Sequence, residues 1–262
     1  MNTVPEDHSG QSAASPRSAA LASDAPRETP TLLFVHGACV RDADWWWSRM
    51  VEPLTERGVP TTAVALPSCG ETGNALGDLA DDVQACRQAV RAVRGPVVLC
   101  GHSYGGVIIT EAGAEERVTQ LLYVTSVMPD SGQSQAEMIG GEPAPWLQPG
   151  EDTIGVDADM MPEYFMQDCD EATVEAAVAR LTRQSLAPFS QPPREIAWRS
   201  TPASYIVCTR DLATPAETQR GRIRAGAHRV EFDAGHHPFL SRPDAFAQLL
   251  VDEIKGSMTT CA

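Results

Sequence analysis

Short apolar runs recur along the chain from Thr31 onward, and stretches with helical periodicity lie between them. Six runs predict strands, namely Leu32–Val35, Thr62–Leu66, Val97–Cys100, Leu121–Thr125, Ser204–Cys208 and Arg229–Phe232. The first four are apolar throughout or nearly so, which is typical of strands buried on both faces of a parallel sheet. Because strands and helices alternate, we predict an α/β fold with a doubly wound, mostly parallel sheet.

Two helices of this fold have clear sequence signals. The segment Asp78–Arg94 places its apolar residues on one helical face, and Gly95 and Pro96 end it. The last helix starts near Pro243, because proline is favoured at an early helical position. It directs apolar residues toward the core, namely Phe246, Leu249, Leu250 and Ile254.

One connection, between the fourth and fifth predicted strands, is much longer than a crossover needs. It contains proline-rich loops and a predicted helix over Glu171–Arg183, for which Asp170 is a plausible N-cap. We predict that residues 129–199 form a cap over the carboxyl ends of the strands, where open α/β sheets bind ligands. Residues 30–128 and 200–262 then form the core.

Composition sets further expectations. Residues 1–29 are small, polar and poor in large apolar side chains, which predicts a disordered tail. The net charge of −15 argues against nucleic acid and anionic membrane surfaces as partners. The seven cysteines form no C-x-x-C pair, which favours a reducing, cytoplasmic setting. The sequence leaves the choice between monomer and homodimer open.

A G-x-S-x-G motif follows the third predicted strand, where Ser103 lies between Gly101 and Gly105. A serine on such a tight strand-to-helix turn has a strained backbone and an exposed hydroxyl. A Cβ at either glycine would collide with the neighbouring strand or helix. The motif therefore predicts a nucleophilic serine.

A serine hydroxyl needs a base to take its proton and an acid to orient that base. Asp211 and His236 follow Ser103 in the order this fold uses, each just after a predicted strand. We predict that these three residues are catalytic. Asp130 remains an alternative acid and His237 an alternative base.

Two backbone amides are expected to bind the substrate oxyanion. Tyr104 directly follows the nucleophile, and Ala38 lies in the loop after the first strand. His36 in the same loop is expected to orient it through hydrogen bonds. Candidate pocket residues are Cys39, Trp146, Tyr164, Phe165 and His237. No metal site and no cofactor are expected.

Together these motifs resemble the α/β-hydrolase superfamily over roughly Thr31 to Ile254. Phe34–Cys39 with Trp45–Trp47, Tyr205–Asp211 and Ala234–His236 are similar to a subgroup of plant methylesterases, hydroxynitrile lyases and small bacterial esterases. The resemblance implies an α/β-hydrolase fold whose helical cap is inserted between the sixth and seventh strands of the fold. These are the fourth and fifth strands predicted here.

Within that subgroup, hydroxynitrile lyases carry a threonine in the oxyanion loop and a lysine after the catalytic histidine. This chain has Gly37 and His237 there, which favours ester hydrolysis. We therefore expect a serine hydrolase that cleaves the carboxylic ester of a small, largely apolar molecule through an acyl-enzyme. A lactonase, a thioesterase, a non-hydrolytic lyase and a ligand-binding member of the fold remain alternatives.

Overall fold

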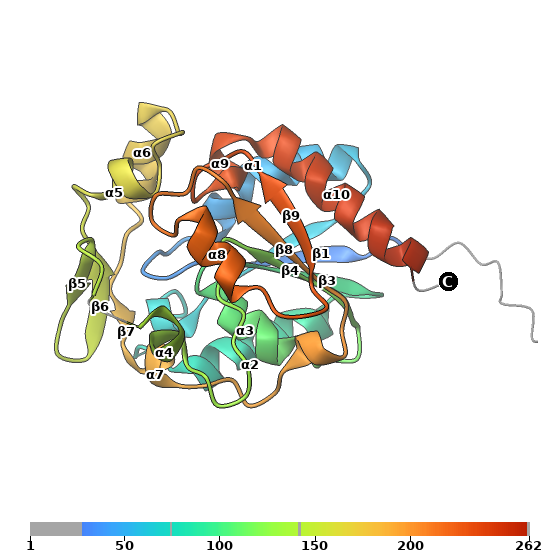
Figure 1. Ribbon diagram of the computed structural model, residues 1–262, viewed down its shortest axis with the longest axis horizontal. Helices are drawn as coiled ribbons and strands as arrows, with labels where there is room; N and C mark the ends of the chain where they lie inside the picture. Colours follow the sequence, from blue (N-terminus) through green and yellow to red (C-terminus); the bar gives the residue numbers. More distant parts are fainter. Residues whose placement is uncertain (1–27, 74, 141–142, 261–262) are drawn as a thin grey trace, which may run out of the picture.

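The computed structural model describes residues 28–73, 75–140 and 143–260, so the predicted disordered tail lies almost wholly outside the described residues. A six-stranded sheet with the order β2-β1-β3-β4-β8-β9 forms the centre of the molecule (Figure 1). Every strand pair in it is parallel. The strands are β1 (Thr31–Val35), β2 (Thr61–Val64), β3 (Val97–His102), β4 (Val118–Val124), β8 (Ala203–Cys208) and β9 (His228–Phe232). The predicted doubly wound parallel sheet is confirmed.

Helices cover both faces of this sheet (Figure 1). One face carries α1 (Ala43–Glu56), α9 (Pro238–Ser241) and α10 (Pro243–Thr260), and the other carries α2 (Leu79–Ala92) and α3 (Gly105–Ala112). Strands β3 and β8 are buried along their whole length because apolar helices pack on both sides of them. None of the helices in the described ranges is long and apolar enough to cross a membrane.

The start of α2 shows why the predicted helix boundaries hold. Asp78 caps the helix by accepting from the Asp81 N–H, and the Asp81 side chain accepts from the Asp78 N–H in return. This reciprocal capping box satisfies two backbone donors that the first helical turn leaves unpaired. The predicted apolar face of the helix is the buried one.

Residues 129–199 lie between β4 and β8 and contain more than the predicted helices. A three-stranded antiparallel sheet, β5-β6-β7, lies among them at the left edge of Figure 1. The sequence did not predict these strands, which are only two to four residues long. The elements are α4 (Gln135–Ile139), β5 (Leu147–Pro149), β6 (Thr153–Val156), α5 (Met161–Tyr164), α6 (Glu171–Val178), β7 (Gln184–Ser185), α7 (Ala187–Ser190) and the 3-10 helix η2 (Ala197–Arg199).

Helix α6 has the predicted N-cap, Asp170, but it ends earlier than the periodicity suggested. After Val178 the chain runs beside the loop that follows β1. Leu181 forms an antiparallel bridge with Val40, and the Thr182 N–H donates to the Cys39 carbonyl at 2.9 Å. Backbone pairing with a distant loop therefore ends the helix and attaches the segment 129–199 to the core beside Ala38 and Cys39.

Candidate active site

Ser103 lies at the sharp turn between β3 and α3, with a φ of 50° that non-glycine residues seldom adopt. The flanking glycines permit this turn. A Cβ on Gly101 would lie 2.7 Å from the Gly105 carbonyl oxygen, and one on Gly105 would lie 2.4 Å from the Val35 carbonyl oxygen. The predicted strained turn and the steric requirement for both glycines are confirmed. Backbone strain of this kind is concentrated at functional sites.

Asp211 follows β8 and accepts a hydrogen bond of 2.7 Å from His236 Nδ1. Both side chains are buried. The Thr214 N–H, Gln219 Nε2 and the Thr125 hydroxyl also donate to the Asp211 carboxylate. Burial alone would raise the pKa of Asp211, but His236 and these donors outweigh it and hold the pKa below its usual value. Asp211 is therefore a buried, fully hydrogen-bonded carboxylate behind His236.

Thr125 is a site residue that the sequence did not reveal. It follows β4 with a φ of 40°, which is rare for a β-branched residue. This backbone turns its hydroxyl to the Asp211 carboxylate. Asp130, the alternative acid, lies farther along the same connection, where its carboxylate pairs with Arg199. It does not line the cavity that contains Ser103, so the structure favours Asp211 over Asp130.

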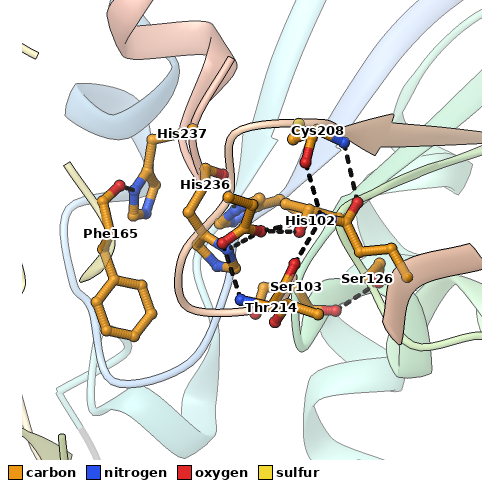
Figure 2. Close-up of polar contacts among 12 residues, drawn as sticks. His102, Ser103, Ser126, Phe165, Cys208, Thr214, His236 and His237 are labelled. Atoms are coloured by element: carbon orange, nitrogen blue, oxygen red, sulfur yellow. Dashed lines mark hydrogen bonds and ion pairs between the residues drawn. The ribbon is translucent and has the colours of Figure 1, made fainter. Parts of the chain in front are cut away.

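Two further buried histidines support the loop that carries His236. His102 Nε2 donates to the His236 carbonyl oxygen at 2.9 Å, and His237 Nδ1 donates to the Phe165 carbonyl oxygen at 3.0 Å (Figure 2). Burial lowers the pKa of His237 to about 3 and that of His102 well below its ordinary value, so both imidazoles stay neutral at neutral pH. His236, rather than His237, makes the hydrogen bond to Asp211.

A cavity of about 390 Å³ extends from Ser103 and His236 toward the segment 129–199. Most of the predicted site residues line it, namely Ala38, Cys39, Ser103, Trp146, Phe165, His236 and His237. Tyr164 is not among the lining residues, and its ring packs against Trp146 with 4.8 Å between centroids. Tyr104 is the N-cap residue of α3, and its side chain points away from the cavity to Asp82.

The site also contains a possible metal-ligand set. His102, His236 and His237 each offer one nitrogen, and these nitrogens lie within 4.8 Å of one another. Two nitrogens on one zinc ion, each bound at about 2.0–2.1 Å, lie at most about 4.2 Å apart. Nitrogens that far apart would have to move closer together to bind one zinc ion. We therefore assign no metal to it.

Known proteins with similar sequence support the family. A family model described as the alpha/beta hydrolase family matches residues 32–249, which is most of the chain. The chain belongs to this family. The resemblance that its motifs predicted is thereby confirmed.

Several known proteins align with this alpha/beta hydrolase over most of both chains. A protein named as an alpha/beta hydrolase from Aspergillus novofumigatus is 26% identical over 241 residues, covering 84% of this chain and 95% of the relative. Methylesterase 7 of Arabidopsis thaliana is 25% identical over 255 residues, covering 84% and 94%. A crystal structure of a pyrethroid hydrolase from Sphingobium faniae JZ-2 matches with a TM-score of 0.78 at 23% identity, covering 87% and 98%. The structural likeness confirms the fold.

A glutamate that the sequence did not reveal holds the loop after β1 of this alpha/beta hydrolase, and its side chain is largely covered. Glu71 accepts from the N–H groups of Ala43 and Leu66, and one of its oxygens lies 2.6 Å from His36 Nε2. Burial would raise the pKa of Glu71, but its bonds to His36 and these N–H groups lower it overall. His36 also approaches the Gly37 carbonyl oxygen at 2.8 Å through Nδ1. His36 thus connects Glu71 to this loop by hydrogen bonds.

A second buried network connects the same loop to the turn after Ser103. Gln184 of β7 accepts from the Cys39 N–H at 2.9 Å and donates to Ser68 Oγ at 2.9 Å. Ser68 donates to Asp82 Oδ2 at 2.5 Å, and the Tyr104 hydroxyl donates to the same oxygen at 2.6 Å. Burial raises the pKa of Asp82 despite these donors. The Asp82 carboxylate therefore connects Tyr104, through Ser68 and Gln184, to Cys39. Tyr104 carries one amide that was expected to bind an oxyanion, and Cys39 follows Ala38, which carries the other.

Proposed function

We propose that this protein is a serine hydrolase that cleaves a carboxylic ester of a small, largely apolar molecule. Ser103 acts as nucleophile, His236 as general base and Asp211 as the residue that orients and stabilises His236. The observation that carries the proposal is the 2.7 Å hydrogen bond from His236 to the buried Asp211, because His236 lines the same cavity as the strained Ser103. Ester cleavage by relatives named as methylesterases agrees with it.

The first half of the proposed reaction forms an acyl-enzyme. His236 Nε2 takes the proton of the Ser103 hydroxyl as Oγ attacks the ester carbonyl carbon and forms a tetrahedral intermediate. His236 donates from Nδ1 to Asp211, which fixes the tautomer that leaves Nε2 free to accept. When the intermediate collapses, the bond to the alcohol oxygen breaks and protonated His236 gives that oxygen its proton.

The second half returns the enzyme to its starting state. His236 takes a proton from a water molecule, whose oxygen attacks the acyl carbonyl carbon. Collapse of this second intermediate breaks the bond to Ser103 Oγ, and His236 returns the proton to that oxygen. The carboxylic acid then leaves. The same steps open a lactone or cleave a thioester, so those substrates form the nearest alternatives.

The oxyanion in both intermediates needs donors that are fixed in advance. We propose the N–H groups of Ala38 and Tyr104 for this role. Tyr104 is the N-cap residue of α3, so its N–H lies among those that the start of a helix leaves unpaired, at the positive end of the helix dipole. Gln184 and Asp82 act as positioning residues, because they hold the neighbouring Cys39 N–H and the Tyr104 side chain.

Replacing Gln184 with methionine is expected to lower kcat about tenfold for a small neutral ester, with a smaller change in KM. Loss of a whole oxyanion donor costs about 10²–10³ in kcat, and a misaligned donor costs part of that. The variant also leaves the Cys39 N–H and Ser68 without this partner. Because Gln184 is fully buried, water cannot replace it, and we expect the melting temperature to fall. Steady-state kinetics and thermal unfolding measure the two effects.

Gln191 provides the matched control. It also joins the segment 129–199 to the core, since it accepts from the Leu79 N–H and donates to Asp78, but it lies outside the network around Asp82. Gln191→Met is expected to lower the melting temperature while kcat stays within about twofold. Equal kcat values for the two variants would remove Gln184 from its proposed positioning role.

The proposed nucleophile can be tested without knowing the substrate. A fluorophosphonate probe forms a bond from phosphorus to an activated serine oxygen and releases fluoride. We expect a single adduct on Ser103 in the purified protein, mapped by peptide mass spectrometry. Labelling should fall at least about 100-fold in His236→Ala, because the hydroxyl then has no base.

His228 provides the matched control for this labelling. It is an exposed histidine paired with Glu253 at the far end of β9, and His228→Ala is expected to label at the wild-type rate. An adduct on another serine, or equal labelling in His236→Ala, would contradict the proposal. A folded protein that never labels but gains melting temperature with a small ligand would favour the ligand-binding alternative.

A further inference from the structure

One arginine faces the cavity that contains Ser103. Of the described residues that line this cavity, Arg222 is the only lysine, arginine, aspartate or glutamate. It is the last residue of α8 (Ala216–Arg222), and Thr218, four positions earlier, lines the same cavity. Residues four apart share a helical face. This face of α8 is therefore turned toward the cavity, and it carries a guanidinium group there.

Arg222 has no partner of opposite charge within the described part of the chain. Its Nε is buried without a hydrogen-bond partner, and no ion pair connects the guanidinium to another residue. Asp211 attracts it through space, but His236, Thr125, Thr214 and Gln219 already occupy that carboxylate. Desolvation lowers the pKa of Arg222, and it remains charged at neutral pH.

The two arginines nearest to Arg222 in the sequence, which do not line the cavity, both have partners. Arg220 pairs with Glu217 and Glu231, and Arg224 donates to the Met128 carbonyl oxygen and to Gln133. The chain carries 35 acidic residues against 20 basic ones, so carboxylates are plentiful. A partly buried guanidinium with no partner for its Nε is costly unless an anion from outside completes it.

A second unpartnered polar group lies in the same cavity wall. Gln135, the first residue of α4, is buried, and its Oε1 has no hydrogen-bond partner among the described residues. The amide can equally present its NH₂ group at this position, because oxygen and nitrogen are exchanged by a half-turn of the side chain. Arg222 and Gln135 line the same cavity, and each has donors there that no described residue uses.

We propose that Arg222 binds a carboxylate group of the substrate, separate from the ester that Ser103 attacks. The inference rests on the proposed ester hydrolysis and names its substrate class: a compound with an ester at one end, a carboxylate at the other and an apolar portion between them. The remaining cavity wall fits that middle portion, since it is largely aliphatic and aromatic, with Val127, Ile139, Leu147, Val156, Met161 and Phe189. A planar carboxylate matches the paired donors of a guanidinium.

Monoesters and diesters of one dicarboxylic acid test this directly. The monomethyl and dimethyl esters of succinic, adipic and suberic acids differ within each pair only by the free carboxylate. For the best chain length we expect the wild-type kcat/KM to favour the monomethyl ester by about 10- to 100-fold, the range of a charge-assisted hydrogen bond. Arg222→Gln should reduce this preference at least about tenfold, and Arg222→Lys should restore part of it.

Arg220→Gln is the matched control, because it removes the same charge from the same helix at an exposed ion pair. It should keep the wild-type preference. A wild-type enzyme that favours the dimethyl ester at every chain length would overturn the proposal. So would a preference that survives in Arg222→Gln, provided that the variant melts as a folded protein.

Binding separates this proposal from the proposed chemistry. With Ser103→Ala, calorimetry measures the affinity for each monomethyl ester without turnover. Tighter binding of the monomethyl than of the dimethyl ester, lost when Arg222→Gln is added, supports the carboxylate site even if no ester is hydrolysed. Hydrolysis of both esters with equal binding would overturn the site and leave the serine mechanism intact.

Discussion

Replacing Ser103 with alanine is expected to lower kcat/KM for an ester by at least about 10⁴-fold while the protein stays folded. The hydroxyl is the only part of the side chain that the proposed reaction uses, and alanine keeps the Cβ. Residual turnover would come from substrate binding and the oxyanion donors alone. Steady-state rates with a chromogenic ester, together with thermal unfolding, measure both parts of the prediction.

Ser126 provides the control for this variant. It lines the same cavity, and its hydroxyl donates to the Ser103 carbonyl oxygen at 2.5 Å. Ser126→Ala removes a hydroxyl of the same kind near the turn and is expected to reduce kcat/KM less than about tenfold. If Ser126→Ala inactivated the protein and Ser103→Ala did not, the assignment of the nucleophile would be wrong.

Replacing Asp211 with asparagine is expected to lower kcat about 10⁴-fold with a small effect on KM. Asparagine has nearly the same shape, but its NH₂ group can turn toward His236 and stabilise the tautomer that lacks a free Nε2. It also carries no charge to stabilise the cationic His236 of the transition state. Steady-state kinetics with the same ester measure kcat and KM separately.

Asp130→Asn is the matched control, since Asp130 follows the neighbouring strand and pairs with Arg199 outside the cavity. It is expected to keep kcat within about twofold of the wild type. A larger loss in Asp130→Asn than in Asp211→Asn would exchange the roles of the two acids. This comparison decides the alternative that the sequence left open.

Stability against pH provides an independent readout for Asp211. Because its folded pKa lies below the ordinary value, ionised Asp211 stabilises the fold at all pH values above about 4. That contribution is lost as the pH falls through the folded pKa. The difference in melting temperature between wild type and Asp211→Asn should therefore stay constant above about pH 5 and shrink as the pH falls from about 4 through the folded pKa. A difference in melting temperature that does not change with pH would show that the charge of Asp211 contributes nothing to the stability of the fold.

The sequence predicted the six core strands and the turn at Ser103 because both depend on local signals. An apolar run such as Val97–Cys100 indicates a strand that is buried on both faces of the sheet. Gly101 and Gly105 lie within the short motif around Ser103, and a Cβ on either would come too close to a backbone carbonyl oxygen. Asp211 and His236 were found because the carboxyl ends of parallel strands meet at one edge of the sheet.

The supporting residues were missed because their partners lie far away along the chain. Gln184 contacts Cys39 across 145 positions, and nothing in the sequence around Gln184 marks it as a partner of that loop. Asp82 did carry a signal: it lies beside Val83 on the buried face of α2, where a carboxylate needs partners. Arg222 lies at the end of a short helix, and only the cavity shows that it lacks a partner.

The contact between Gln184 and Cys39 limits how this family member can be recombined with its relatives. A chimera that takes residues 129–199 from another alpha/beta hydrolase exchanges Gln184 and Leu181 but keeps Cys39, Val40 and the network beneath them. Such a protein would have new residues lining the cavity, and its loop after β1 would lack the hydrogen bond from Cys39 to Gln184. Chimeras that keep their activity should therefore take the loop after β1 and the segment 129–199 from the same parent protein.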